Sequence, residues 1–73
     1  MTEQRWNQEF AKKLRYKLDS QGIDQRRLSN LSGISEAAIS RYLAGTQTPK
    51  VYALTQIAKA LNSSLYELIP FER

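Results

Sequence analysis

The stretch that decides the fold runs from Asp24 to Pro49 and reads DQRRLSNLSGISEAAISRYLAGTQTP. It predicts two short helices, because Asp24 is a suitable N-cap for the first and Ser35 for the second, which extends to about position 43. Gly33 breaks the first helix and Gly45 ends the second, since glycine readily takes the left-handed conformation that follows a helix. Two short helices joined by a glycine-containing turn indicate a helix-turn-helix.

The segment before this stretch has one apolar stripe at helical spacing. Its members recur every four residues and are Trp6, Phe10, Leu14 and Leu18. They predict one helix that ends near Ser20. The stripe is either a core face or a face for a membrane surface or a coiled coil. The pattern stops after a single helix, which favours the core.

The segment after the stretch predicts two more helices. Thr48 and Pro49 are typical of an N-cap followed by proline at the first helical position. The inward residues of this fourth helix are expected to be Val51, Leu54, Ile57, Ala58 and Leu61. Ser64 and Glu67 have the spacing of a capping box for a short fifth helix, which Pro70 stops. No run alternates with period two, so we predict one compact all-α domain of five helices over residues 1–73.

Composition excludes several function classes. The chain has no cysteine and no histidine, which removes thiolate chemistry and the commonest general base and metal ligand. Its seven carboxylates are scattered singly, so we expect no enzyme, no metal site, no cofactor and no small-molecule ligand. No apolar stretch approaches the roughly 20 residues that span a bilayer, and residues 1–6 lack the apolar part of a signal peptide. We therefore expect a cytoplasmic protein that does not contact membranes.

The positive charge is concentrated in the first two thirds of the chain. The net charge is +4, and all of it lies in residues 1–50, because residues 51–73 carry two residues of each sign. Such a charge either attracts a polyanion or simply keeps a small domain soluble. The basic part is the part that contains the expected helix-turn-helix.

The detailed spacing of this stretch resembles the λ-repressor-like family, also called the Cro or XRE type. The resemblance is carried by Gln25-x-x-Leu28-Ser29-x-x-x-Gly33-Ile34-Ser35-x-x-x-Ile39-Ser40-Arg41-Tyr42-x-x-Gly45-x-x-x-Pro49. It continues in Leu54-x-x-Ile57-Ala58-x-Ala60-Leu61 and Ser64-Leu65-x-x-Leu68. The resemblance implies a five-helix domain, bacterial or phage-encoded, that binds double-stranded operator DNA. It also implies a homodimer that regulates transcription, most simply a repressor of the phage or prophage type on a palindromic operator.

The sequence departs from the family at a few positions. Ser29 stands where the family usually has alanine, a small change that should pack. Leu18 and Leu43 occupy the positions of an arginine–glutamate pair of many members, so we expect an apolar contact in place of that ion pair.

In the first helix of the motif, Leu28 and Leu31 are expected to face inward.

Carried over by position, the base-reading residues of the family fall on Ser35, Glu36, Ala37, Ser40 and Arg41. Arg41 can form a bidentate pair with guanine O6 and N7, or can contact a phosphate. Glu36 can accept from cytosine N4, or can simply complement the helix dipole in the first turn. The phosphate-binding residues are expected to be Gln25, Arg26, Thr46, Gln47, Thr48 and Lys50.

Aromatic residues near the end of the chain are candidates for the dimer interface. Tyr66 and Phe71, with Tyr52, either meet a second copy or cap the small core. The main alternative function is a partner-binding module, such as an antitoxin-like protein, that keeps the helix-turn-helix shape. Arg41 opposed by Glu36 favours that alternative, because the reading helix then carries little positive charge. An RNA-binding role is disfavoured, since no aromatic residues interleave with the basic ones.

Overall fold

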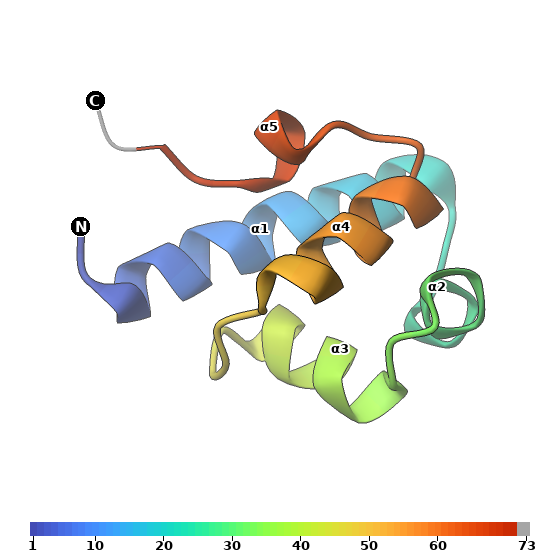
Figure 1. Ribbon diagram of the computed structural model, residues 1–73, viewed down its shortest axis with the longest axis horizontal. Helices are drawn as coiled ribbons and strands as arrows, with labels where there is room; N and C mark the ends of the chain where they lie inside the picture. The colour runs from blue at the N-terminus through green and yellow to red at the C-terminus, as the bar shows by residue number, and fades with distance from the viewer. Residues whose placement is uncertain (72–73) are drawn as a thin grey trace.

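The computed structural model describes residues 1–71, and these form five helices joined by short connections (Figure 1). The helices are α1 Glu3–Gln21, α2 Gln25–Ser32, α3 Glu36–Ala44, α4 Val51–Ala60 and α5 Leu65–Leu68. No strand occurs in this part of the chain, so the all-α prediction is confirmed. Over the same residues, no helix is long and apolar enough to cross a membrane.

Local capping explains where the helices begin and end. The Thr2 hydroxyl accepts the Arg5 N–H at 3.1 Å and begins α1. At its other end, Gly22 takes φ +65° and returns its N–H to Asp19 and Leu18 carbonyls. α1 is 19 residues long, because no glycine or proline interrupts the helix between these two caps. The predicted end of α1, near Ser20, is therefore correct to within one residue.

The core lies between the helices, and every helix contributes to it. The fully buried side chains are Phe10, Leu14, Leu28, Ile39, Ile57, Leu61 and Leu68. Phe10 is central, because Trp6 stacks on its ring at 5.5 Å and Tyr42 meets it edge-on at 6.3 Å. The apolar stripe of α1 is a core face, as predicted.

Two side chains that were expected to face inward do not. Leu31 is 50% exposed and Val51 is 76% exposed. In α2 the buried face is set by Leu28 and Ser32, four residues apart, and Leu31 points away from it. In α4 the buried residues begin at Ala53, and Val51 falls at the edge of that face. Helical spacing alone assigned both residues to the wrong side.

The expected start of α4 is also wrong. The N-cap is Lys50, and the helix begins at Val51, two residues later than the proline rule predicts. Pro49 is buried, and the Thr48 hydroxyl bonds to α1 instead of capping the next helix. A tertiary contact has therefore replaced the local cap.

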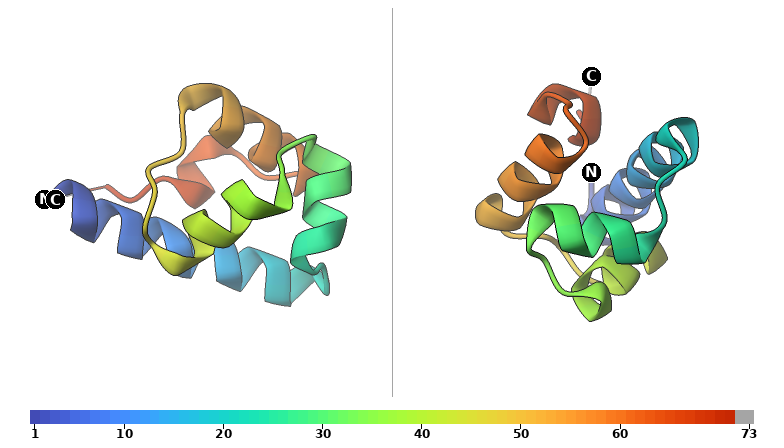
Figure 2. Two further views of the ribbon diagram at one scale, coloured as in Figure 1. Left: turned by 90° about the horizontal axis from the view of Figure 1, so that it is seen from below. Right: turned by 90° about the vertical axis from the view of Figure 1, so that its right-hand side faces the viewer.

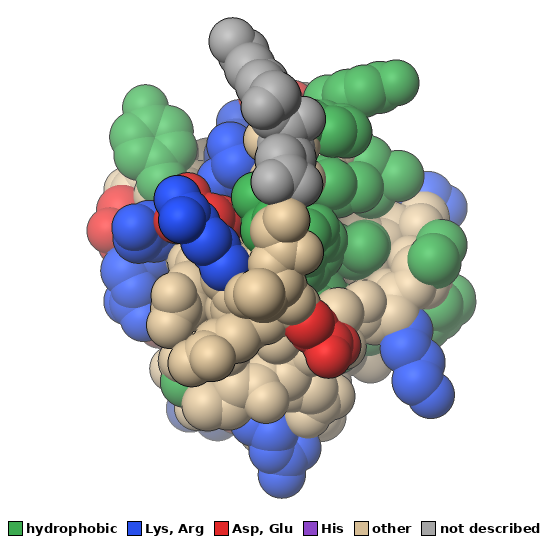
Figure 3. Space-filling model, turned by 90° about the vertical axis from the view of Figure 1, so that its left-hand side faces the viewer, with side chains coloured by type: hydrophobic (Ala, Val, Ile, Leu, Met, Phe, Trp, Pro, Cys, Tyr) green, Lys and Arg blue, Asp and Glu red, His purple; other side chains and the backbone are tan. Residues whose placement is uncertain are grey.

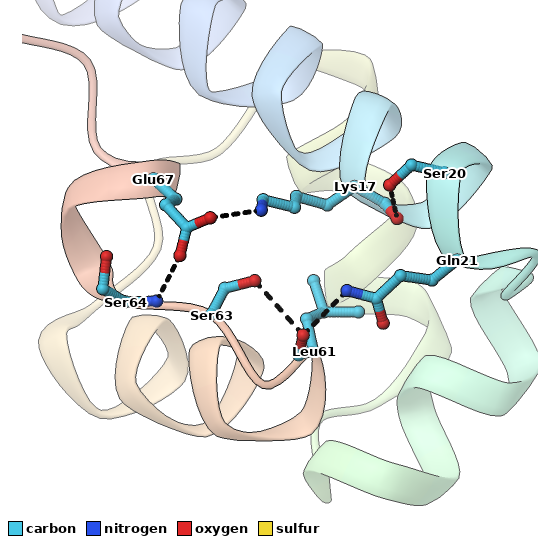
Figure 4. A network of polar contacts seen from close by, with 7 residues as sticks. All are labelled: Lys17, Ser20, Gln21, Leu61, Ser63, Ser64 and Glu67. Atoms are coloured by element: carbon cyan, nitrogen blue, oxygen red, sulfur yellow. Dashed lines mark hydrogen bonds and ion pairs between the residues drawn. The ribbon is translucent and has the colours of Figure 1, made fainter.

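α5 is fastened to α1 by polar contacts (Figure 4). The Glu67 carboxylate receives the Lys17 ammonium on one oxygen and the Ser64 backbone N–H, at 2.8 Å, on the other. This completes the predicted capping box of Ser64 and Glu67. Beside it, Gln21 Nε2 donates to the Leu61 carbonyl at 2.8 Å. The ammonium of Lys17, followed by the Ser64 N–H, lowers the pKa of Glu67 below its ordinary value of 4.5.

Acid should loosen this attachment. Because the pKa of Glu67 is lowered in the folded state, its stabilising contribution is present above 4.5 and is lost as the pH falls through the lowered value. We expect the free energy of unfolding of Glu67→Gln to decrease less with falling pH than that of the wild type, as measured by urea titration at several acidic pH values. Lys17→Met should flatten the acid limb similarly, because it removes the main cause of the shift. An acid limb unchanged in both variants would contradict this account.

Candidate nucleic-acid interface

The turn between α2 and α3 is held by two serine hydroxyls, one bonded to the backbone carbonyl of Ile34 and the other to its backbone N–H. Ser29 Oγ donates to the Ile34 carbonyl at 2.6 Å, and the Ile34 N–H donates to Ser32 Oγ at 3.1 Å. Gly33, at φ +76°, permits the turn and donates its N–H to the Ser29 carbonyl. Ile34 packs against the core, so the turn sits in a fixed position. Sequence reasoning treated Ser29 as a packing change and missed its hydrogen bond.

α3 presents one face to the core and another to solvent. Its inward residues are Ile39 and Tyr42, and it begins at Ser35, whose Oγ accepts the Ala38 N–H at 3.1 Å. All the predicted base-reading residues are exposed, namely Ser35, Glu36, Ala37, Ser40 and Arg41. Ala44 is exposed as well and continues the same face at i+4 from Ser40, a spacing that could have identified it from the sequence.

Arg41 is available for a ligand. It is exposed, and among the described residues no hydrogen bond or ion pair engages its guanidinium, so Glu36 does not neutralise it by contact. Seen from below, α3 lies in front of the other helices, between α2 and the loop that leads to α4 (Figure 2, left). A helix that stands forward in this way can enter a groove without a clash from the rest of the domain.

The N-terminus of α2 carries three of the basic or amide residues of the motif. Asp24 Oδ1 caps the helix by accepting the Arg27 N–H at 2.8 Å. Gln25 is half-buried, whereas Arg26 and Arg27 are exposed. Close by, a shallow depression is lined by both Leu18 and Leu43 as well as Gln25. Leu18 is buried and Leu43 half-buried, as expected for an apolar contact in place of an ion pair.

The loop after α3 offers fewer donors than expected. Thr46, Gln47 and Lys50 are exposed. Thr46 Oγ1 also donates to the Arg41 carbonyl at 3.3 Å. Thr48 is half-buried, and its hydroxyl faces Asn7 rather than solvent. In this structure the Thr48 hydroxyl is directed to acceptors on α1.

A second exposed surface is apolar and lies away from α3. Tyr66 is 78% exposed and stacks on Phe71 at 5.5 Å, and Phe71 is 58% exposed. Together with Leu65 and Ile69, these rings line a shallow apolar depression. Hydrophobic side chains gather at the upper right of the face in Figure 3. Tyr52, in the first turn of α4, is 70% exposed. These aromatic rings are exposed to solvent instead of being buried in the core.

Comparison with known proteins agrees with this geometry. The model of the helix-turn-helix family HTH_3 matches residues 14–68 of the 73-residue chain, a segment that contains α2 to α5 and the C-terminal part of α1. The chain belongs to this family of Cro/XRE-type helix-turn-helix proteins, the family of DNA-binding transcription regulators that its sequence resembles.

Two solved structures show the same fold. The restriction-modification controller protein C.AhdI from Aeromonas hydrophila superposes with a TM-score of 0.83 at 24% identity, covering 86% of this chain and 96% of that one. An HTH_3 family transcriptional regulator from Vibrio cholerae superposes with a TM-score of 0.88 at 24% identity, covering 92% of this chain. The chain spans 38% of the length of that regulator. No curated protein sequence gave a significant match.

Proposed function

We propose that the chain binds double-stranded DNA sequence-specifically and regulates transcription, with α3 in the major groove. The observation that carries the proposal is the outward face of α3, where the guanidinium of the exposed Arg41 has no partner within the described residues. Arginine at such a position can form two hydrogen bonds to guanine, which few other side chains can do. Ala37 and Ala44 leave room beside it for the base edges and for thymine methyl groups.

In this proposal, phosphate contacts position the domain and α3 specifies the sequence. Gln25 and Arg26 lie at the N-terminus of α2, where free backbone N–H groups favour an anion. The donors Thr46, Gln47 and Lys50 lie between α3 and α4, and they contact a second stretch of the DNA backbone in this proposal. Ser35 and Ser40 border the reading face, and Glu36 either accepts from cytosine or complements the dipole of α3.

One domain of this size reads few base pairs, so we propose that two copies bind a palindromic operator. Tyr66, Phe71 and Tyr52 form the interface in this proposal, because exposed aromatic rings are costly in water and favourable between copies. A repressor of the phage type, acting in the cytoplasm on the nucleoid, is the regulator we favour. The likeness to a restriction-modification controller protein supports a second candidate, control of such a system.

Selection of bound sites from random duplexes, followed by gel-shift titration at several salt concentrations, tests the proposal. We expect a selected sequence that is palindromic, with affinity that falls as salt rises. If no duplex shifts at any salt concentration, the DNA-binding proposal is wrong and a partner-binding module becomes the better account.

Lys50→Ala should weaken binding to all duplexes alike. The exposed ammonium of Lys50 is expected to neutralise one phosphate in each copy, so its loss should reduce the slope of log affinity against log salt by about 0.9 per copy. The measurement is a salt titration on the selected operator and on an unrelated duplex. Lys59→Ala is the matched control, since Lys59 is exposed near the other end of α4. Equal slopes for Lys50→Ala and the wild type would remove Lys50 from the interface.

A further inference from the structure

The loop between α3 and α4 is fastened to the first two turns of α1. Thr48 Oγ1 lies 2.8 Å from Asn7 Oδ1 and 2.7 Å from Glu3 Oε2. A hydroxyl has one proton, so it donates to one of these acceptors at a time. In either case the side chain of Thr48 is turned toward α1 and joins residues that are more than 40 positions apart.

The burial of Asn7 is explained by this contact. Asn7 is 7% exposed, and among the described residues only Asn7 and Ser32 are polar and buried. A polar side chain is costly to bury unless it is hydrogen-bonded, and Thr48 is the partner of the Asn7 side chain. Asn7 Oδ1 therefore keeps this hydrogen bond only while the loop lies against α1.

The two ends of the loop also lie close to the rest of the domain. Gly45 has φ +74°, and a Cβ at this position would lie 3.6 Å from the Gln8 Cα, so the loop begins in close contact with α1. Pro49 is buried at the other end. The loop is thus held on both sides of Thr48, whereas Gln47 and Lys50 are left exposed.

We propose that Asn7 is a positioning residue for DNA binding, which acts by holding the α3–α4 loop through Thr48. The proposal rests on the proposed function, because the groups that it positions are the phosphate donors Thr46, Gln47 and Lys50. A loop that is already ordered in the free protein loses less conformational entropy when it binds. Thr48 then contributes to affinity through α1 and makes no phosphate contact of its own.

The test compares four variants by fluorescence anisotropy on the selected operator and on an unrelated duplex. Thr48→Val removes both contacts of the hydroxyl and should weaken binding to the two duplexes by a factor of about five to ten. Asn7→Ala removes the buried acceptor and leaves Glu3, so it should weaken both duplexes in the same way but by a smaller factor. Thr48→Ser keeps the hydroxyl and should bind as the wild type does. Thr55→Val is the matched control, since within residues 1–71 the Thr55 hydroxyl bonds only to the Val51 carbonyl of its own helix.

Two readouts separate positioning from a general loss of stability. Gln47→Ala should weaken binding in the wild-type background and have little further effect in the Asn7→Ala background, because the loop is then no longer held. Amide hydrogen exchange in the free protein should quicken at Thr46 and Gln47 in Asn7→Ala, with α2 and the core of α4 unchanged. Affinities are referred to the active fraction of each preparation, so partial unfolding does not imitate the effect.

The outcomes are distinguishable from those of the proposed function. A wild-type protein that binds no duplex overturns both proposals. A wild-type protein that binds, with Asn7→Ala of equal affinity, overturns the positioning role of Asn7, whatever the effect of Thr48→Val. Additive effects of Asn7→Ala and Gln47→Ala, with unchanged loop exchange, also overturn it.

Discussion

Replacing Arg41 by alanine is expected to remove the preference for one base pair of the operator. The guanidinium of Arg41 is exposed and unpaired within the described residues, so its loss leaves the fold intact and removes a contact with a base. A bidentate contact of this kind is worth about 1–3 kcal/mol, or about 5- to 150-fold in affinity. The measurement is the affinity for the selected operator and for its single-base variants at each position.

The matched variants separate base reading from charge. Arg41→Lys keeps the charge and loses the two-pronged geometry, so it should lose most of the discrimination and less of the affinity. Arg26→Ala, at the N-terminus of α2, should weaken all duplexes alike. If Arg41→Ala weakens all single-base variants equally, Arg41 contacts phosphate and the reading role passes to other residues of α3.

The second large effect is expected from Tyr66→Asp. Tyr66 is 78% exposed, so an aspartate there costs the free domain little, but it places a charge in the proposed interface. The variant should sediment as a monomer. Its affinity for a two-half-site operator should fall about 10²- to 10⁴-fold, because the second half-site is no longer bound in an intramolecular step. Its affinity for a single half-site should change little.

Tyr16→Asp provides the control for this result. Tyr16 is 71% exposed on α1 and lies outside the apolar depression that Tyr66 lines. It should therefore leave both the sedimentation and the operator affinity unchanged. A Tyr66→Asp protein that still sediments as a dimer would show that the apolar surface of α5 has another use.

The parts of the fold that local chemistry determines could be predicted from the sequence. Asp24 and Ser35 cap α2 and α3 as expected, and the glycines at positions 22, 33 and 45 all follow a helix with positive φ. A cap is decided by a few neighbouring residues, so it can be recognised without knowing the fold. The exposed face of α3 follows from the same argument, since its period is fixed once its start is known.

The errors arose where distant contacts decided the structure. The Thr48–Pro49 pair has the local form of a helix start, but its threonine bonds to a residue 41 positions earlier. The burial of Asn7 could not be predicted, because a single asparagine in a helix is ordinarily expected to lie in solvent. Leu31 and Val51 were misplaced since an apolar residue at the edge of a helical face is buried only if another helix reaches it.

The hydrogen bond from Ser29 to the Ile34 carbonyl has a consequence for exchanging recognition helices between family members. The angle at which α3 leaves the turn is set partly by a side chain of α2, at a position where the family usually has alanine. A chimera that takes only α3 from a relative would keep the hydrogen bond of Ser29 in this chain. The base-reading residues of the relative would then be held at the angle that α3 has in this chain. The segment exchanged should therefore cover residues 29–45, so that the relative's turn and the angle of its α3 are transferred together with its base-reading residues.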